Sequence, residues 1–142
     1  MIQKRKNIQN TIMPAQLSPT PASRSASDRS RILSEAVAEC ARRLEIGSTA
    51  LKNVIGLSQP TASRLLNGKY AIPENSKEWE LAAQFVRLYR ALLSLVGSDE
   101  MARTWLNSPN QAFDGQKPAE VIKRIDGLLH TCDYLDAHRA VV

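Results

Sequence analysis

The segment 57–69, LSQPTASRLLNGK, carries amides, hydroxyls and one arginine at a spacing that suits contacts with DNA bases. Ala62, Leu65 and Leu66 recur at helical spacing and would face a core. Hydrogen-bonding groups occupy the opposite face of this predicted helix: Gln59, Thr61, Ser63, Arg64 and Asn67. Such groups can pair with base edges in a major groove, and the planar guanidinium of Arg64 can bind O6 and N7 of a guanine. We therefore predict that this helix reads DNA, with Arg64 as the leading contact.

Local signals set the ends of this predicted recognition helix. The hydroxyl of Ser58 can cap its first turn, and Pro60 is tolerated in that turn because no N–H is needed there. Asn67 and Gly68 should end the helix, since both residues tolerate the left-handed conformation. Just past that end, backbone N–H groups and the ammonium of Lys69 can hold a phosphate of the DNA backbone.

Two further helices are expected before the recognition helix. A helical pattern begins at Asp28, with its apolar residues on one stripe, and Gly47 is expected to end it. Ser48 can cap a short second helix through Ile55, and Gly56 supplies the tight turn that follows. Three short helices in this order are what a helix-turn-helix requires.

The second half of the chain also has helical periodicity and no alternating β-pattern. A long helix is predicted over residues 77–96, and its two adjoining apolar stripes require packing from two sides. A shorter helix should follow a cap at Ser98 and present Met101, Trp105 and Leu106 inward.

The C-terminal segment is predicted to hold a turn at Asp114-Gly115 and two more helices. Pro118 starts the first of these, a short helix with Val121, Ile122 and Ile125. After Gly127 comes a final helix with apolar residues at Leu128, Leu129, Cys132 and Leu135. Taken together, these patterns predict an all-α fold.

The charge of the chain is divided unequally along its length. Residues 1–69 hold 11 Lys/Arg and 4 Asp/Glu, a balance of +7, whereas residues 70–142 hold 8 and 10, a balance of −2. The front half can therefore bind a polyanion such as DNA, and the rear half is not expected to do so. We expect a flexible basic arm at 1–27, a helix-turn-helix unit with the long central helix at 28–96, and a small helical unit at 97–142.

Several functional classes find no support in the sequence. Cys40 and Cys132 are too few and too far apart for a disulfide framework, and buried free thiols in a reducing cytoplasm are expected. His130, Cys132 and His138 share one predicted helix but do not converge on a metal. No apolar run reaches the roughly 18–20 residues of a membrane span. We expect a cytoplasmic protein with no enzymatic activity, cofactor or metal.

Two blocks of sequence carry a family resemblance. One is VIGLSQPTASRLLNGK, residues 54–69, and the other is ARTWLNSPNQAFDGQKPAEVIKRIDGLL, residues 102–129. The matching positions of the second block are Trp105-Leu106, Pro109-Asn110, Gly115, Pro118 and Gly127. With both blocks present, the chain resembles antitoxins of the Xre/MbcA/ParS type, which join an Xre-like helix-turn-helix to a C-terminal toxin-binding domain.

This resemblance implies a protein with two tasks. It implies binding and silencing of a partner toxin, frequently one with a RES domain that destroys cellular NAD, and repression of its own operon through the helix-turn-helix. In such complexes the C-terminal end of the antitoxin lies against the toxin and can close its NAD pocket. The alternative is a helix-turn-helix regulator with no toxin, and an adjacent, overlapping reading frame would favour the antitoxin.

The predicted toxin-binding surface lies in the rear unit. Its residues are Trp105, Phe113, Tyr134, Leu135, His138, Arg139, Val141 and Val142. Trp105 and Phe113 can alternatively serve the core. The final helix ends in a small apolar tip bearing a carboxylate, which can plug a pocket made for a phosphate-bearing dinucleotide, and an inert terminus is the alternative. One copy reads too few base pairs for specificity, so we expect a homodimer on half-sites about one helical turn, or a multiple, apart.

Overall fold

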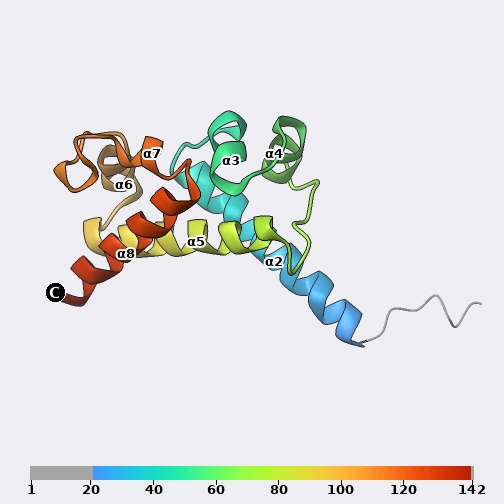
Figure 1. Cartoon of the computed structure of the whole chain (residues 1–142). Coiled ribbons are helices and arrows are strands. Elements are labelled where there is room, and N and C mark those ends of the chain that lie inside the picture. The colour runs from blue at the N-terminus through green and yellow to red at the C-terminus, as the bar shows by residue number, and fades with distance from the viewer. Residues whose placement is uncertain (1–20, 142) are drawn as a thin grey trace, which may run out of the picture.

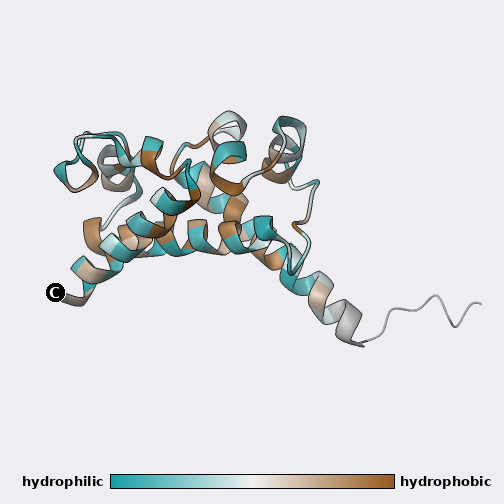
Figure 2. Ribbon diagram, in the orientation of Figure 1, coloured by the Kyte–Doolittle hydropathy of each residue, from teal (hydrophilic) through white to brown (hydrophobic). Residues whose placement is uncertain are grey.

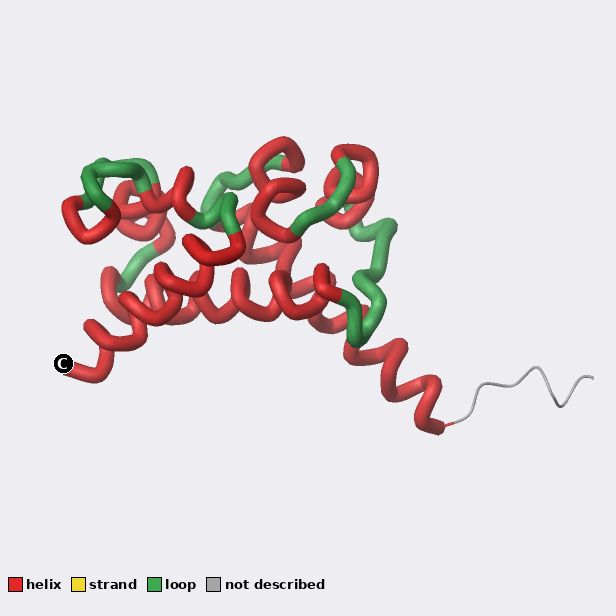
Figure 3. Tube along the Cα trace, in the orientation of Figure 1, coloured by secondary structure: helices red, strands yellow, loops and turns green. Residues whose placement is uncertain are grey.

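The computed structural model describes residues 21–141 and shows an all-α fold over that range, as predicted (Figures 1 and 3). Its elements are α2 (Pro21–Arg43), α3 (Ser48–Ile55), α4 (Gln59–Leu66), α5 (Lys77–Val96), α6 (Asp99–Leu106), the 3-10 turn η1 (Gln111–Phe113), α7 (Pro118–Val121) and α8 (Ile125–Val141). The pairing of Asn110 with Gln116 is an isolated bridge, and the described range contains no strand.

The long helix α5 is the centre of the fold. Ser76 caps its first turn by accepting the Trp79 N–H at 3.1 Å, and Gly97 ends it in the left-handed conformation at φ 88°. It packs against α2 and α3 of the front unit and against α8 of the rear unit. The predicted packing from two sides is therefore confirmed.

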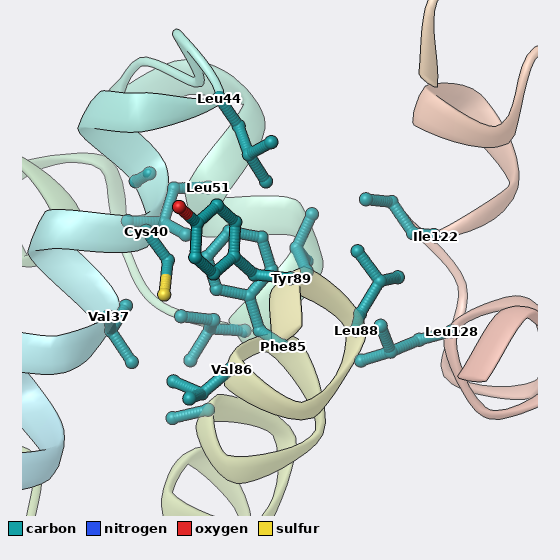
Figure 4. Close-up of a cluster of buried hydrophobic side chains, with 14 of the residues drawn as sticks. Val37, Cys40, Leu44, Leu51, Phe85, Val86, Leu88, Tyr89, Ile122 and Leu128 are labelled. Atoms are coloured by element: carbon teal, nitrogen blue, oxygen red, sulfur yellow. The ribbon is translucent and has the colours of Figure 1, made fainter. Parts of the chain in front are cut away.

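The buried side chains of α5 join the two units into one core. Phe85 and Leu88 are completely buried, and Figure 4 shows side chains of α2 and α3 on one side of them and Ile122 and Leu128 on the other. Apolar and polar residues alternate along the helices (Figure 2), and many of the apolar ones are buried in this core. Fully burying a side chain of this size contributes about 1.5–3 kcal/mol, so α5 stabilises both units together.

The ends of the first two described helices differ from the prediction. Helix α2 begins at Pro21 rather than Asp28, and a proline at the first helical position costs no hydrogen bond. It ends at Arg43, where Glu45 adopts φ 56° and the Ile46 N–H reaches the Ala41 carbonyl at 2.8 Å. This left-handed turn closes the helix before Gly47 is reached. The part of the expected arm at residues 1–20 lies outside the described residues.

The predicted helix start after Gly127 is wrong, because α8 begins at Ile125 and includes the glycine. A Cβ at Gly127 would overlap the backbone carbonyl oxygen of Val121 and lie 2.8 Å from the Val121 Cγ1. The missing side chain therefore lets α8 approach the end of α7. Met101, which was predicted to point inward, is 52% exposed, and the apolar side chains of Ile125 and Leu129 are 62% and 41% exposed.

Two buried serines fasten the loop between α4 and α5 to α2. The Ile72 N–H donates to Ser34 Oγ at 2.8 Å, and the hydroxyl of Ser30 donates to the Ile72 carbonyl. Ser34 in turn donates to the Ser30 carbonyl at 2.7 Å. These bonds satisfy backbone groups that burial of Ile72 removes from water.

Cys40 and Cys132 are free and buried, as predicted. Burial raises the pKa of each thiol to about 11, so both stay protonated at neutral pH. Within residues 21–141, no helix is both long and apolar enough to cross a membrane.

Candidate DNA-reading and partner-binding surfaces

Helices α3 and α4 form a helix-turn-helix joined by a three-residue turn. Gly56 adopts φ 84° at its start, and the N–H groups of Gly56 and Leu57 both donate to the Lys52 carbonyl, at 2.8 and 3.0 Å. A glycine takes this left-handed conformation without the steric cost that a Cβ would add. The inward side chains are fully or almost fully buried: Leu51, Val54, Ile55, Ala62 and Leu65.

The first turn of α4 confirms the predicted cap. Ser58 Oγ accepts the Thr61 N–H at 3.3 Å, with Pro60 in the same turn. Ser48 does not cap α3; its hydroxyl instead accepts Gln59 Nε2 at 2.7 Å. This bond ties the start of α4 to the start of α3, a contact that the helical pattern of the sequence does not reveal.

The residues predicted to read DNA lie together on the outer side of α4 and the loop after it. Gln59, Arg64, Asn67 and Lys69 are exposed, while Thr61 and Ser63 are half-buried. The Arg64 guanidinium donates to Thr61 Oγ1 at 3.2 Å, which holds it over the exposed face of the helix. All six predicted residues keep some exposure to solvent, and Thr61 and Arg64 are in direct contact.

The predicted use of backbone N–H groups for a phosphate is wrong. The Asn67 N–H donates to the Ser63 carbonyl at 3.1 Å, and the Lys69 N–H donates to the Arg64 carbonyl at 2.8 Å. The left-handed residue at this end is Gly68, at φ 74°, whereas Asn67 has φ −90°. A phosphate at this point is therefore left to the side chains of Asn67 and Lys69.

Ion pairs divide the cations of residues 25–69 into two groups. The arginines of α2 in the described part of its surface all pair with carboxylates: Arg29, Arg31, Arg42 and Arg43. Lys52, Arg64 and Lys69 form no ion pair with any described residue, and all three belong to the helix-turn-helix. Residues 25–69 hold 7 Lys/Arg and 4 Asp/Glu, a balance of +3, and the other 4 cations of the front half lie in residues 1–24.

Aromatic side chains from three elements form a cluster in the rear unit. Trp105 of α6 stacks on Tyr134 of α8 with ring centroids 6.4 Å apart and planes 25° apart. Phe113 of η1 meets both rings edge-on, at 6.1 Å from Trp105 and 5.3 Å from Tyr134. His138 lies against the other side of Tyr134, at 4.1 Å. This arrangement holds η1 and α6 against α8.

Burial separates the predicted toxin-binding residues into two sets. Phe113 is 5% exposed and Leu135 is 1% exposed, so both belong to the core and cannot present a surface to a partner. His138 and Arg139 are exposed, and Trp105 and Tyr134 are half-buried. The side chain of Val141 and the whole of Val142 lie outside the described residues.

A charged contact missed by sequence reasoning anchors the last turns of α8. Arg87 of α5 donates through Nε to Asp136 at 3.0 Å and through Nη2 to Asp133 at 3.3 Å. The hydrogen bond with Asp136 raises the pKa of Arg87. Arg139 also pairs with Asp136, at 3.1 Å. Nothing in the sequence pairs these residues, because α5 and α8 are brought together only by the fold.

A second polar contact joins the two units across α6. Asp99 accepts the Tyr89 hydroxyl at 2.7 Å and pairs with Arg43 at 3.3 Å. Arg103 pairs with Glu45 at 2.8 Å and donates to the Arg43 carbonyl at 2.7 Å. The rear unit is thus attached to the end of α2 as well as to α5.

The segment from the end of α5 through α8 now has a counterpart among known proteins. Residues 91–140 match the family described as the antitoxin Xre/MbcA/ParS C-terminal toxin-binding domain. We call this matched segment the antitoxin domain, after the family that it resembles. The resemblance predicted from the second sequence block is confirmed, and this antitoxin domain includes the aromatic cluster.

A solved structure shares the fold over more of the chain. It is a chain of the M. tuberculosis MbcT–MbcA toxin–antitoxin complex, with a TM-score of 0.59 and 21% sequence identity. The match covers 78% of this chain and 96% of that chain, so the shared fold extends beyond the antitoxin domain. A comparison with curated proteins gives no match.

Proposed function

We propose that the protein is the antitoxin of a type II toxin–antitoxin pair, which binds its toxin through the antitoxin domain and represses its own operon through α3 and α4. The family match over residues 91–140 is the observation that carries this proposal. The ion-pair-free cations on the helix-turn-helix support the DNA-binding part, because phosphate binding depends on cations that are not already neutralised.

The toxin-facing surface that fits the structure is the outer end of α8. The exposed residues His138 and Arg139 lie there, beside the half-buried Tyr134. Arg87 and Asp136 fix this end against α5, so little conformational entropy is lost when a partner binds it. We assign the exposed end of α8, around His138 and Arg139, to occlusion of the NAD pocket of a RES-type toxin.

Removing residues 138–142 is expected to abolish neutralisation while the protein stays folded. Among the described side chains of α8, the last buried one is Leu135, so the deletion removes no described core side chain. NAD consumption by the toxin is measured in the presence of the truncated protein, with deletion of residues 2–20 as the control that keeps the tip. Full neutralisation by the protein lacking 138–142 would show that the tip does not occlude the pocket.

Operator binding is assigned to the surface of α4 and the loop that follows it. Replacing Arg64 with alanine is expected to cost about 1–3 kcal/mol at the operator, because a bidentate contact with a base is lost. A gel-shift titration measures this effect. Arg124→Ala is the matched control, since it removes an equal charge from an exposed position of the rear unit. Equal operator affinity for the Arg64 variant and the wild type would refute the assignment.

A further inference from the structure

Two large apolar side chains of α8 are exposed to solvent. Among residues 25–140, whose side chains the structure describes, four large apolar residues are exposed: Ile32, Met101, Ile125 and Leu129. Ile125 and Leu129 are 62% and 41% exposed, and because they are four positions apart on one helix they are neighbours on its surface. We call this pair the apolar ridge. A partner that covers the ridge removes its apolar area from water, which is favourable.

The ridge belongs to the side of α8 that the core leaves uncovered. Leu128, Cys132 and Leu135 are buried and fall on one sector of the helix. At 100° per residue, the sector outside the core holds eight residues: Ile125, Asp126, Leu129, His130, Asp133, Asp136, Ala137 and Ala140. We call this sector the outer face of α8. Asp136 is half-buried, and the other seven residues are exposed.

Acidic side chains accompany the ridge on the outer face. The eight residues include three aspartates, Asp126, Asp133 and Asp136, and neither lysine nor arginine. The side chain of Asp133 is 75% exposed, and its ion pair with Arg87, at 3.3 Å, leaves it open to a cation of a partner. A surface that complements the outer face therefore has an apolar groove with lysine or arginine at its rim.

The tip of α8 is too small to hold a protein partner by itself. The tip comprises the five residues 138–142, whereas a stable interface involves roughly 20–30 residues on each side and buries about 800 Å² of each partner. The interface must therefore extend beyond the tip. The outer face runs from the ridge through Asp136 to Ala140, so it leads directly into the tip.

We propose that the toxin carries an apolar groove with a cationic rim, and that this groove receives Ile125 and Leu129 from the outer face of α8. The residues matched by the toxin-binding family, 91–140, include the whole outer face. The helix is already formed and packed on α5 in the free chain, so its binding needs no folding step. This inference rests on the proposed function and extends it: the ridge supplies affinity, the tip occludes the pocket, and a stable complex needs both.

Isothermal titration calorimetry of the full chain with the purified product of the adjacent gene tests the ridge. Ile125→Glu and Leu129→Glu should each raise the dissociation constant about tenfold or more, because each places a carboxylate in an apolar groove. The double variant Ile125→Ala/Leu129→Ala, which removes apolar area without adding charge, should also raise it about tenfold or more. Ile32→Glu is the matched control, since Ile32 is 57% exposed but lies on α2, and it should leave the constant unchanged.

The cationic rim is tested by a charge reversal. Asp133→Lys should weaken binding, and its effect should shrink as the salt concentration rises, because salt screens exposed charges. Asp28→Lys is the matched control, since the side chain of Asp28 is 66% exposed on α2, and it should bind like the wild type. An Asp133→Lys variant that binds like the wild type at low salt would contradict a cationic rim.

The outcomes separate this inference from the proposed function. If the wild type and the Ile125→Ala/Leu129→Ala variant bind the gene product equally, the ridge is not in the interface and the antitoxin function stands. A loss in Ile32→Glu as large as that in the ridge variants would overturn the ridge as well. Failure of the wild type to bind would instead contradict the proposed function, and the ridge with it.

Discussion

Replacing Gly127 with alanine is expected to lower the free energy of unfolding by about 3 kcal/mol or more, because the added methyl group has no space. Its Cβ would overlap the carbonyl oxygen of Val121 and lie 2.9 Å from the carbonyl carbon of the same residue. These are backbone atoms, so relief requires α8 to move away from α7. Urea or thermal denaturation of the full chain measures the loss.

The matched control is Gly47→Ala. Gly47 has φ −83°, and nothing lies within 4 Å of the Cβ that alanine would add. Its cost should not exceed about 1 kcal/mol, the typical loss at a helix cap. Equal stabilities for the two variants would mean that α7 and α8 are not in close contact at Gly127. If α8 moves away from α7 in the Gly127→Ala variant, toxin neutralisation by this variant should weaken along with its stability. Arg64 should be unaffected, because it lies on α4, which stays intact.

Replacing Phe113 with alanine is expected to cost about 3–5 kcal/mol, the usual effect of emptying a buried aromatic site. Phe113 is 5% exposed and packs edge-on against Trp105, Tyr134 and His130. Its loss leaves a cavity beneath η1 that the neighbouring rings cannot fill without leaving their rotamers. Chemical denaturation followed by tryptophan fluorescence measures the change, since Trp105 borders the cavity.

Two comparisons separate a core role for Phe113 from a contact role. Met101→Ala removes an exposed apolar side chain from the same unit and should change stability by less than about 0.5 kcal/mol. Phe113→Leu keeps most of the volume and should retain toxin binding if the ring acts only through packing. A Phe113→Leu variant that is stable but does not bind toxin would show that the Phe113 ring contacts the toxin directly.

The sequence predicts helix ends correctly where caps and prolines set them. The bounds of α5 follow from Ser76 and Gly97, and the start of α4 follows from Ser58 and Pro60, because caps and prolines act within one turn. Gly127 shows the opposite case. A glycine near a helix usually indicates an end, but here it serves a close approach between two helices that only the tertiary structure creates.

The candidate sites were predictable to different degrees. The DNA-reading face repeats with the period of one helix, so the sequence places Gln59 and Arg64 on it directly. The partner-binding face depends on which side of α8 the fold covers, and Leu135 was assigned to the wrong side for that reason. Arg87 and Asp136 are 49 residues apart and no pattern joins them. Long-range contacts of this kind follow from packing and not from periodicity.

The most direct test of the proposed function is the binding of the full-length protein to the product of the adjacent gene, measured by co-expression and pull-down. We expect a stable complex that survives Arg64→Ala and is lost when residues 138–142 are removed. That result would place toxin binding at the end of α8 and keep it separate from DNA reading. Failure of the wild-type protein to bind the product of either neighbouring gene would contradict the antitoxin function and favour a helix-turn-helix regulator that acts alone.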